Sequence, residues 1–307
     1  MVEMRIFFKG KFRLFCAMIF AGVFAFFLLD MVSYKKPISG LDHIEFLDQI
    51  DSKLFDSGAE EMKNHKVIFT GITRDNGRDI PTMLAVFYKI GSMFEDYRVV
   101  VFENDSSDNT LKILKEAEAR DSKIKIISKK FNLKKMPSIK FIADIRNQYL
   151  REIESKEYDD FDIVIIFDMD MKYGIDLRAI KHSFSIIDEW EAVCSNGIFT
   201  RDGRMYDAFA FRNDEFFYGP NEVGMEWYLR KIRPSAQKIY PVTGNLIKVS
   251  SCFGGMAIYK KKYIRGCRYD SINEDCEHVV FHRCIDRENS GRMYMNPVQI
   301  IRYEHYE

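Results

Sequence analysis

Two aspartates spaced one residue apart, Asp168 and Asp170, directly follow the apolar run Ile163–Phe167. A short run of branched apolar residues is typical of a buried strand. Two carboxylates held together at a strand end repel each other and lose hydration unless a cation or a proton lies between them. Mg²⁺ and Mn²⁺ take oxygen ligands and keep open positions for phosphate oxygens. The spacing therefore predicts a divalent metal at this strand end, bound together with a nucleotide diphosphate.

Polar residues follow two other apolar runs in the same way. Thr73 and Arg74 come after the run 66–72, and Glu103 and Asp105 come after the next apolar run along the chain. In a sheet of parallel strands the carboxyl ends meet at one edge, where ligands bind. We therefore expect these residues to share one cleft with the aspartate pair.

The elements that must position these residues alternate along the chain. Predicted strands cover residues 66–72, 97–105, 123–128 and 160–171, and predicted helices cover 80–94, 111–121 and 141–153. Apolar strands that alternate with helices form mainly parallel sheets with helices on both faces. The sequence therefore predicts an α/β, Rossmann-like fold.

Composition sets the size of the core and excludes a charge-driven partner. The chain has 307 residues, 47% of them hydrophobic, which is enough for one large domain or two small ones. Its 46 Lys and Arg residues balance its 46 Asp and Glu residues. No net field therefore attracts nucleic acid.

The N-terminal segment differs from the rest. Basic residues precede the apolar run Leu14–Leu29, which Asp30 closes. With its apolar neighbours the run approaches the ~20 residues that span a bilayer, and no small-x-small cleavage site follows it. We interpret residues 1–32 as a cytoplasmic tail and signal-anchor helix, 33–64 as a polar stem and 65–307 as the folded body. A cleaved signal peptide is the alternative.

The basic flank of this anchor also predicts an orientation. Positive residues remain on the cytoplasmic side, so the protein would be a single-pass type II membrane protein. Its body would lie on the non-cytoplasmic side, in the Golgi or ER lumen if the source is eukaryotic.

No Cys or His spacing suggests zinc. Such a compartment would permit one or two disulfides among the last four cysteines, and buried free thiols are the alternative.

Several segments of the chain match, in the same order, segments of a known protein family. They read VVVFENDSSDNTLKIL, IADIRNQYL, AVCSNGIFTRDGRMYDAFAFRND, VSSCFGGMAIYKKKYI, NEDCEHVVFHRCI and RMYMNPVQIIRYEH. Over roughly residues 67–305 the chain resembles the GT-A glycosyltransferases, and more narrowly the fungal capsule-type α-1,3-mannosyltransferases. It departs from that family's Asn-Asp-Val at Asp168-Met169-Asp170. Despite this difference we still expect the same fold, but the difference leaves the identity of the donor sugar open.

The resemblance implies a metal-dependent glycosyltransferase that moves a sugar, mannose in that family, from a donor such as GDP-mannose to a glycan acceptor. Asp168 and Asp170 would bind the donor diphosphate and Mn²⁺ or Mg²⁺, with Asp170 as the direct ligand. His305 would complete the metal site, or it is a surface histidine.

The resemblance also implies donor contacts at the ends of the neighbouring strands. Glu103 and Asp105 would hold the nucleoside, because carboxylates accept hydrogen bonds from ribose hydroxyls and base N–H groups. Thr73 and Arg74 would lie beside them. Arg146 would face the diphosphate with its guanidinium fork, or it is a surface charge on its helix.

On the acceptor side the resemblance places three candidate catalytic residues. Glu277 or His278 would take the proton of the acceptor hydroxyl in an inverting transfer. Asp207 would bind acceptor hydroxyls, or it pairs with Arg212. Gly254–Gly255 would form a sharp turn or allow a close backbone approach.

Two other function classes share some of these features. A haloacid-dehalogenase-type phosphohydrolase also carries Asp-x-Asp after an apolar strand, with one aspartate as nucleophile. A membrane-tethered protein that binds a sugar nucleotide without turnover would keep the same fold, because fold alone does not establish activity. Metal-dependent binding without product release would indicate the second class.

Overall fold

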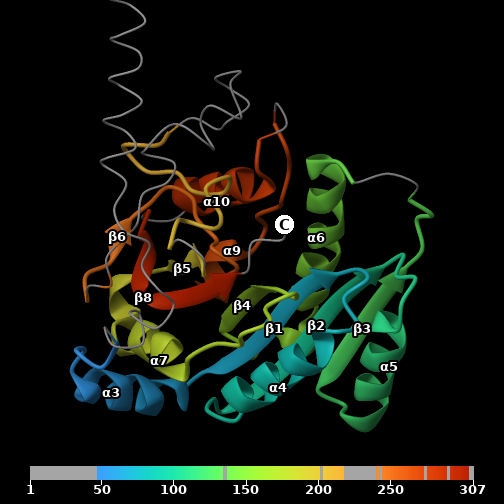
Figure 1. Ribbon diagram of the computed structural model, residues 1–307, viewed down its shortest axis with the longest axis horizontal. Coiled ribbons are helices and arrows are strands. Elements are labelled where there is room, and N and C mark those ends of the chain that lie inside the picture. Colours follow the sequence, from blue (N-terminus) through green and yellow to red (C-terminus); the bar gives the residue numbers. More distant parts are fainter. Residues whose placement is uncertain are drawn as a thin grey trace, which may run out of the picture. The chain divides into compact units, whose positions relative to one another are not determined.

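The structure is a computed structural model of the chain (Figure 1). It describes residues 47–133, 137–200, 203–217, 240, 242, 244–272, 275–288 and 291–303. The chain divides into two compact units, Met1–Pro37 and Ile38–Glu307, and every described residue belongs to the second. The predicted anchor helix lies outside the described residues. Within them, no helix is long and apolar enough to cross a membrane.

A sheet of eight strands forms the centre of the described part, in the order β3-β2-β1-β4-β7-β5-β8-β6. The strands are β1 (Lys66–Thr73), β2 (Asp96–Asn104), β3 (Ile124–Lys129), β4 (Ile163–Asp168), β5 (Ala192–Phe199), β6 (Ile247–Lys248), β7 (Met256–Lys260) and β8 (Met293–Tyr303). The pairs β1·β2, β1·β4, β2·β3 and β5·β8 are parallel, whereas β7 runs antiparallel to β4 and β5, and β6 runs antiparallel to β8. The prediction of a mainly parallel sheet is confirmed.

The register of the parallel strands brings their polar ends to one edge. Ile72 of β1 lies opposite Asp168 of β4, and Thr73 lies opposite Glu103 of β2. The predicted strand 160–171 is longer than β4, because the chain leaves the sheet directly after Asp168. The aspartate pair therefore straddles the strand end.

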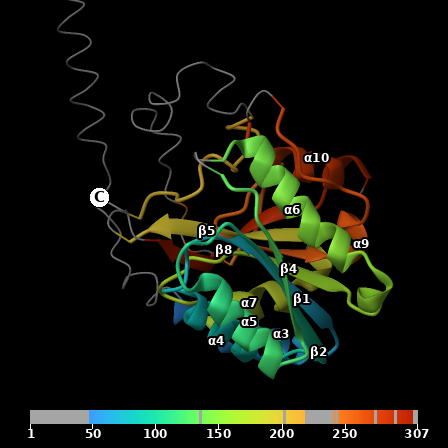
Figure 2. The same cartoon turned by 90° about the vertical axis from the view of Figure 1, so that its right-hand side faces the viewer.

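Helices cover both faces of this sheet. They are α3 (Ser52–Met62), α4 (Ile80–Gly91), α5 (Thr110–Arg120), α6 (Ile139–Ile153), α7 (Leu177–Ser185), α9 (Lys261–Ile264) and α10 (Glu277–Glu288), with short 3₁₀ turns η1 (Lys156–Tyr158) and η2 (Ile187–Glu189). In Figures 1 and 2, α6, α9 and α10 lie on one face, and α3, α4, α5 and α7 lie on the other. Each face has its own apolar core. Because the central strands are covered on both sides, nearly every residue of β1 and β4 is buried.

Part of the predicted stem packs onto this fold. Helix α3 lies against α7 so closely that a Cβ on Gly58 would come within 1.8 Å of the carbonyl oxygen of Lys181. Arg178 at the start of α7 also pairs with Asp48. Residues 47–64 are thus joined to the body in the structure.

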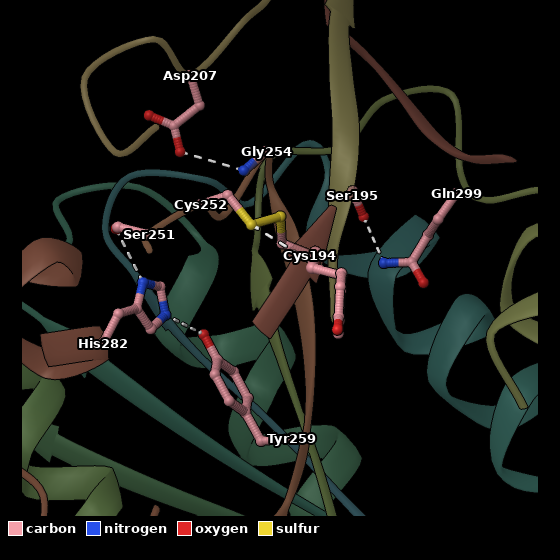
Figure 3. The surroundings of a disulfide bond; sticks show 10 residues. Cys194, Ser195, Asp207, Ser251, Cys252, Gly254, Tyr259, His282 and Gln299 are labelled. Atoms are coloured by element: carbon pink, nitrogen blue, oxygen red, sulfur yellow. Dashed lines mark hydrogen bonds between the residues drawn. A yellow bond between two sulfur atoms is a disulfide. The ribbon is translucent and has the colours of Figure 1, made fainter. Parts of the chain in front are cut away.

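Two disulfides tie the second half of the chain together. Cys194 of β5 is bonded to Cys252, and Cys267 is bonded to Cys284 of α10, while Cys276 is a buried free thiol (Figure 3 shows the first pair). The expectation that disulfides lie among the last four cysteines is wrong for the first pair. Cys194 meets its partner only because β5 pairs with the strand that follows Cys252.

Candidate active site

A cleft of about 560 Å³ opens at the carboxyl ends of β1 and β4. Its lining residues are Ile72, Thr73, Arg74, Asp75, Asn76, Arg78, Asp79, Asp108, Asp168, Met169, Asp170, Lys172 and Tyr206. The structure therefore brings Thr73 and Arg74 together with the aspartate pair. Four more lining residues, Asp75, Asn76, Arg78 and Asp79, come from the loop between β1 and α4.

Hydrogen bonds fix this loop against its neighbours. The carboxylate of Asp75, whose φ is +49°, accepts from the backbone N–H and the hydroxyl of Ser107 in the next loop. The side-chain amide of Asn76 donates to the carbonyl of Met169, between the two aspartates. The wall of the cleft is therefore connected to the aspartate segment itself.

Asp168 is held by two tyrosines. Its Oδ2 accepts from the hydroxyl of Tyr206 at 3.2 Å and from the hydroxyl of Tyr303, at the end of β8, at 3.3 Å. The two tyrosine rings are stacked, with centroids 3.4 Å apart and planes 5° apart. The backbone N–H of Asp168 donates to the carbonyl of Gly255 at 2.8 Å. These contacts hold the Asp168 carboxylate in one orientation.

The glycine pair makes this arrangement possible. A Cβ on Gly255, whose φ is +87°, would lie 2.0 Å from the Tyr303 hydroxyl oxygen. A Cβ on Gly254 would lie 2.2 Å from the carbonyl oxygen of Ser195 in β5. The close backbone approach expected for Gly254–Gly255 is therefore present: Gly254 packs against strand β5, and Gly255 packs against the side chain of Tyr303.

Arg146 is buried behind Asp168. Its Nε donates to Oε1 of Glu277 at 2.9 Å, and its side chain is 7% exposed. The guanidinium carbon lies 5.5 Å from the ring centroid of Phe253 and 5.6 Å from that of Tyr269. One terminal nitrogen is 3.9 Å from Oδ1 of Asp168. Arg146 is therefore no surface charge, and it stabilises the aspartate from behind without lining the cleft.

The remaining acceptor-side candidates lie around this arginine. Glu277 and His278 begin α10 and are both buried. The His278 ring stacks on Phe253 at 4.1 Å, and neither of its nitrogens has a hydrogen-bond partner among the described residues. Burial and the nearby Arg146 hold the pKa of His278 well below its ordinary value. The imidazole is therefore neutral.

Asp207 is fastened by backbone donors. Its Oδ2 accepts from the N–H of Gly254 (Figure 3), and its Oδ1 accepts from the N–H of Ala210, each at 3.2 Å. The alternative that Asp207 pairs with Arg212 is wrong. Arg212 forms a buried ion pair of 2.6 Å with Asp275 instead.

Asp168, Asp170 and Asp207 all have raised pKa values. Desolvation and the charge of Asp170 raise the pKa of Asp168 to about 7, although Arg146 acts in the opposite direction. Burial raises the pKa of Asp207 to about 6. The ionised form of such a carboxylate is stabilised when a cation binds beside it.

Two predicted donor residues stabilise loops and do not line the cleft. Glu103 accepts from the backbone N–H of Ser106 and from the hydroxyl of Ser128. Asp105, with φ +52°, accepts from the backbone N–H groups of Phe131 and Asn132. Their carboxylates are thus already hydrogen-bonded within the protein.

The donor set of the aspartate pair fits a hard divalent cation. Asp170 is exposed at the cleft, and no side chain among the described residues hydrogen-bonds to its carboxylate. Asp168 already accepts from two hydroxyls, so Asp170 is the freer ligand. No group of three or more Asp, Glu, His or Cys in the described part could hold a metal alone. His305, the third predicted ligand, lies outside the described residues.

The sequence did not identify two residues of this site, Tyr206 and Tyr303. Tyrosine is intermediate in its tendency to be buried, so its type alone does not indicate a functional role. Their positions give a weak indication of such a role, because Tyr206 precedes Asp207 and Tyr303 lies two residues before His305.

A mainly parallel sheet of this topology, with an aspartate pair at the carboxyl end of a central strand beside a polar cleft, is consistent with the GT-A class of glycosyltransferases. Residues 66–287 match the family described as cryptococcal mannosyltransferase 1, and the chain belongs to that family. Membership places it among glycosyltransferases and not among phosphohydrolases. No curated protein matches the chain significantly.

Solved structures show more distant similarity. The glucosyl-3-phosphoglycerate synthase of M. tuberculosis is 12% identical over 82% of this chain and 76% of its own, with a TM-score of 0.47. The mannosyltransferase PcManGT of Pyrobaculum calidifontis, in complex with GDP-Man and Mn²⁺, is 14% identical over 86% and 69%, with a TM-score of 0.45. TarS 1-349 of S. aureus, in complex with UDP-GlcNAc, is 13% identical over 79% of this chain, with a TM-score of 0.44. The chain spans 60% of that TarS structure.

Proposed function

We propose that the chain is a metal-dependent glycosyltransferase that moves a sugar from a nucleotide-sugar donor to a hydroxyl group of a glycan acceptor. The observation that carries this proposal is the cleft, where Asp168 and Asp170 lie beside Arg74 and Arg78. The carboxylates attract a cation, and guanidinium groups match phosphate oxygens. A diphosphate bound through a divalent cation satisfies both kinds of group.

The metal in this proposal is Mn²⁺ or Mg²⁺, with Asp170 as direct ligand and Asp168 beside it. Diphosphate oxygens and water would supply the other ligands. When bound, such a cation stabilises the negative charge of the departing nucleoside diphosphate. Tyr206 and Tyr303 keep the Asp168 carboxylate in one orientation while the donor binds.

We further propose mannose as the transferred sugar and GDP-mannose as the donor, because the description of the matching family is that of a mannosyltransferase. The nucleoside would lie along the β1–α4 loop, near Thr73 and Asp108. Glu103 and Asp105 would support this wall through their loop contacts.

On the acceptor side we propose Asp207 as the residue that meets the acceptor hydroxyl. Its pKa of about 6 is close to neutrality, where a carboxylate is an effective proton acceptor. Glu277 is less suited, because its carboxylate is paired with Arg146. His278 would shape the pocket beside them.

We also propose the type II topology, which rests on the sequence of residues 1–32. The basic flank would stay cytoplasmic, and the body would lie across the membrane. The two disulfides support an oxidising compartment for the body.

Calorimetry with GDP and UDP, in the presence and absence of Mn²⁺, tests the donor site. We expect one nucleotide to bind only with Mn²⁺, and we expect Asp170→Asn to remove that binding. Asp56→Asn, an exposed change on α3, is the matched control. Failure of both nucleotides to bind would contradict the proposal, whereas Mn²⁺-dependent binding without sugar transfer to any acceptor would indicate an inactive binding protein.

A further inference from the structure

A second cavity, of about 480 Å³, lies at the opposite edge of the sheet from the aspartate pair. Ile163, the first residue of β4, lines it, and Asp168 ends the same strand. The length of this strand separates the two sites by roughly 17 Å. Small-molecule sites have volumes of about 300–1,000 Å³. The cavity is thus distinct from the catalytic cleft and large enough for a ligand.

The floor of this cavity is apolar. It is formed by residues of both cores, namely Leu150, Ile153, Phe161, Ile163, Ile187 and Ile264. Their side chains come from α6, β4, η2 and α9 and, in the case of Phe161, from the turn just before β4. Since these elements meet at the edge of the sheet, the two cores leave a gap between them there.

Four cationic side chains line the same cavity, Lys260, Lys261, Lys262 and Arg265. The amine of Lys261 donates to the carbonyl of Tyr158. The other three form no ion pair with a carboxylate in the described part of the chain. The amine of Lys260 is partly buried and lies 5.5 Å from the ring centroid of Trp190. Burial and the nearby Arg292 lower the pKa of Lys260, although Asp188 and Glu191 act in the opposite direction.

Five acidic residues line the same cavity. Three of the five carboxylates are engaged by other side chains, Glu61 and Asp162 by His65 and Glu154 by Arg268. Asp159 and Asp188 remain, and both are exposed. Outside these pairs, two carboxylates and four cations line the cavity beside its apolar floor.

We propose that this cavity binds a small amphipathic anion, with its apolar body on the isoleucine-rich floor and its negative group beside Lys260 and Arg265. A carboxylate, phosphate or sulfonate head would serve equally, because each accepts charge-assisted hydrogen bonds from these donors. The site is independent of the donor cleft and of the proposed transfer reaction.

Two dyes that differ only in their charge test this site. Anilinonaphthalene sulfonate carries the anion, and N-phenyl-naphthylamine has the same rings without it. Fluorescence titration of the full chain should show one saturable site that prefers the sulfonate. Lys260→Gln should weaken sulfonate binding by about tenfold, the effect of losing one charge-assisted contact, and leave the neutral dye unaffected. Lys260→Arg should restore the preference.

Lys112→Gln, an exposed change on α5, is the matched control and should alter neither dye. Equal affinity of the two dyes for the wild-type chain would overturn the proposal, as would equal weakening of both by Lys260→Gln. Displacement of the sulfonate dye by GDP with Mn²⁺ would also overturn it, because the dye would then occupy the catalytic cleft.

Discussion

Asp168 connects the cleft to the buried side of the sheet. Its Oδ2 accepts from Tyr206 and Tyr303, and Arg146 lies 3.9 Å from its Oδ1. Even with these partners, desolvation and Asp170 keep its pKa raised. The residue therefore lowers the stability of the protein when it is ionised and no cation is present.

This makes stability depend on pH in a definite direction. The carboxyl of Asp168 has a pKa of about 7 in the fold and 3.8 ordinarily. Between these values the folded state binds more protons than the unfolded state, so stability decreases as pH rises. We expect Tm to fall more for the wild type than for Asp168→Asn between about pH 5 and about pH 8, and Mn²⁺ to reduce the fall. Equal falls in both proteins, measured by calorimetry, would contradict this.

The buried ion pair with Arg146 indicates a structural role for the carboxylate of Glu277. Glu277→Gln would leave the buried Arg146 cation without the negative charge paired with it, so we expect the free energy of unfolding to decrease by about 3–5 kcal/mol. Glu116→Gln, which breaks an exposed pair with Arg120, should cost under about 1 kcal/mol. Denaturant unfolding measures both. A large loss of transfer by Glu277→Gln with unchanged stability would instead identify Glu277 as the proton acceptor.

At the scale of elements, the turn before β7 decides whether Asp168 is correctly placed. Gly255→Ala would force a Cβ to within 2.0 Å of the Tyr303 hydroxyl at φ +87°. Gly266 has a similar φ of +79° with nothing within 4 Å of an added Cβ. Gly266→Ala should therefore show backbone strain alone, about 1–2 kcal/mol. Gly255→Ala should cost more and should also weaken Mn²⁺-dependent nucleotide binding. Equal effects of the two substitutions on stability and binding would show that the close approach is unimportant.

The first four strands and three helices could be predicted from the sequence, because each strand is rich in apolar residues and is followed by polar ones. The second half could not be divided into elements in the same way. There β7 enters the sheet between β4 and β5 in the antiparallel sense, and nothing local in Met256–Lys260 specifies these distant partners.

The same reason limits what could be predicted of the site. Thr73 and Asp168 end strands, and Arg74 and Asp170 come just after them. The topology of the sheet alone brings such residues together. The engagement of Glu103 by Ser128, in contrast, depends on side-chain contacts between loops.

For the whole molecule, the sequence predicts a body on the far side of a membrane from its N-terminus. Protease added to sealed microsomes should therefore spare residues 47–303 until detergent is added. Immunoblotting with antibody to the body measures this. Digestion of the body without detergent would contradict the orientation, and a mature chain that begins near Met31 would show a cleaved signal peptide.

The most direct test of the central claim is the release of nucleoside diphosphate from a panel of sugar nucleotides, with a glycan acceptor, in the presence of Mn²⁺ or of EDTA. We expect one donor, GDP-mannose in our proposal, to turn over only with the metal. We expect Asp170→Asn to lose at least about 10²-fold in rate while its Tm stays near that of Asp56→Asn. Turnover that persists in EDTA, or an Asp170→Asn variant as active as the wild type, would contradict metal-dependent transfer at the aspartate pair.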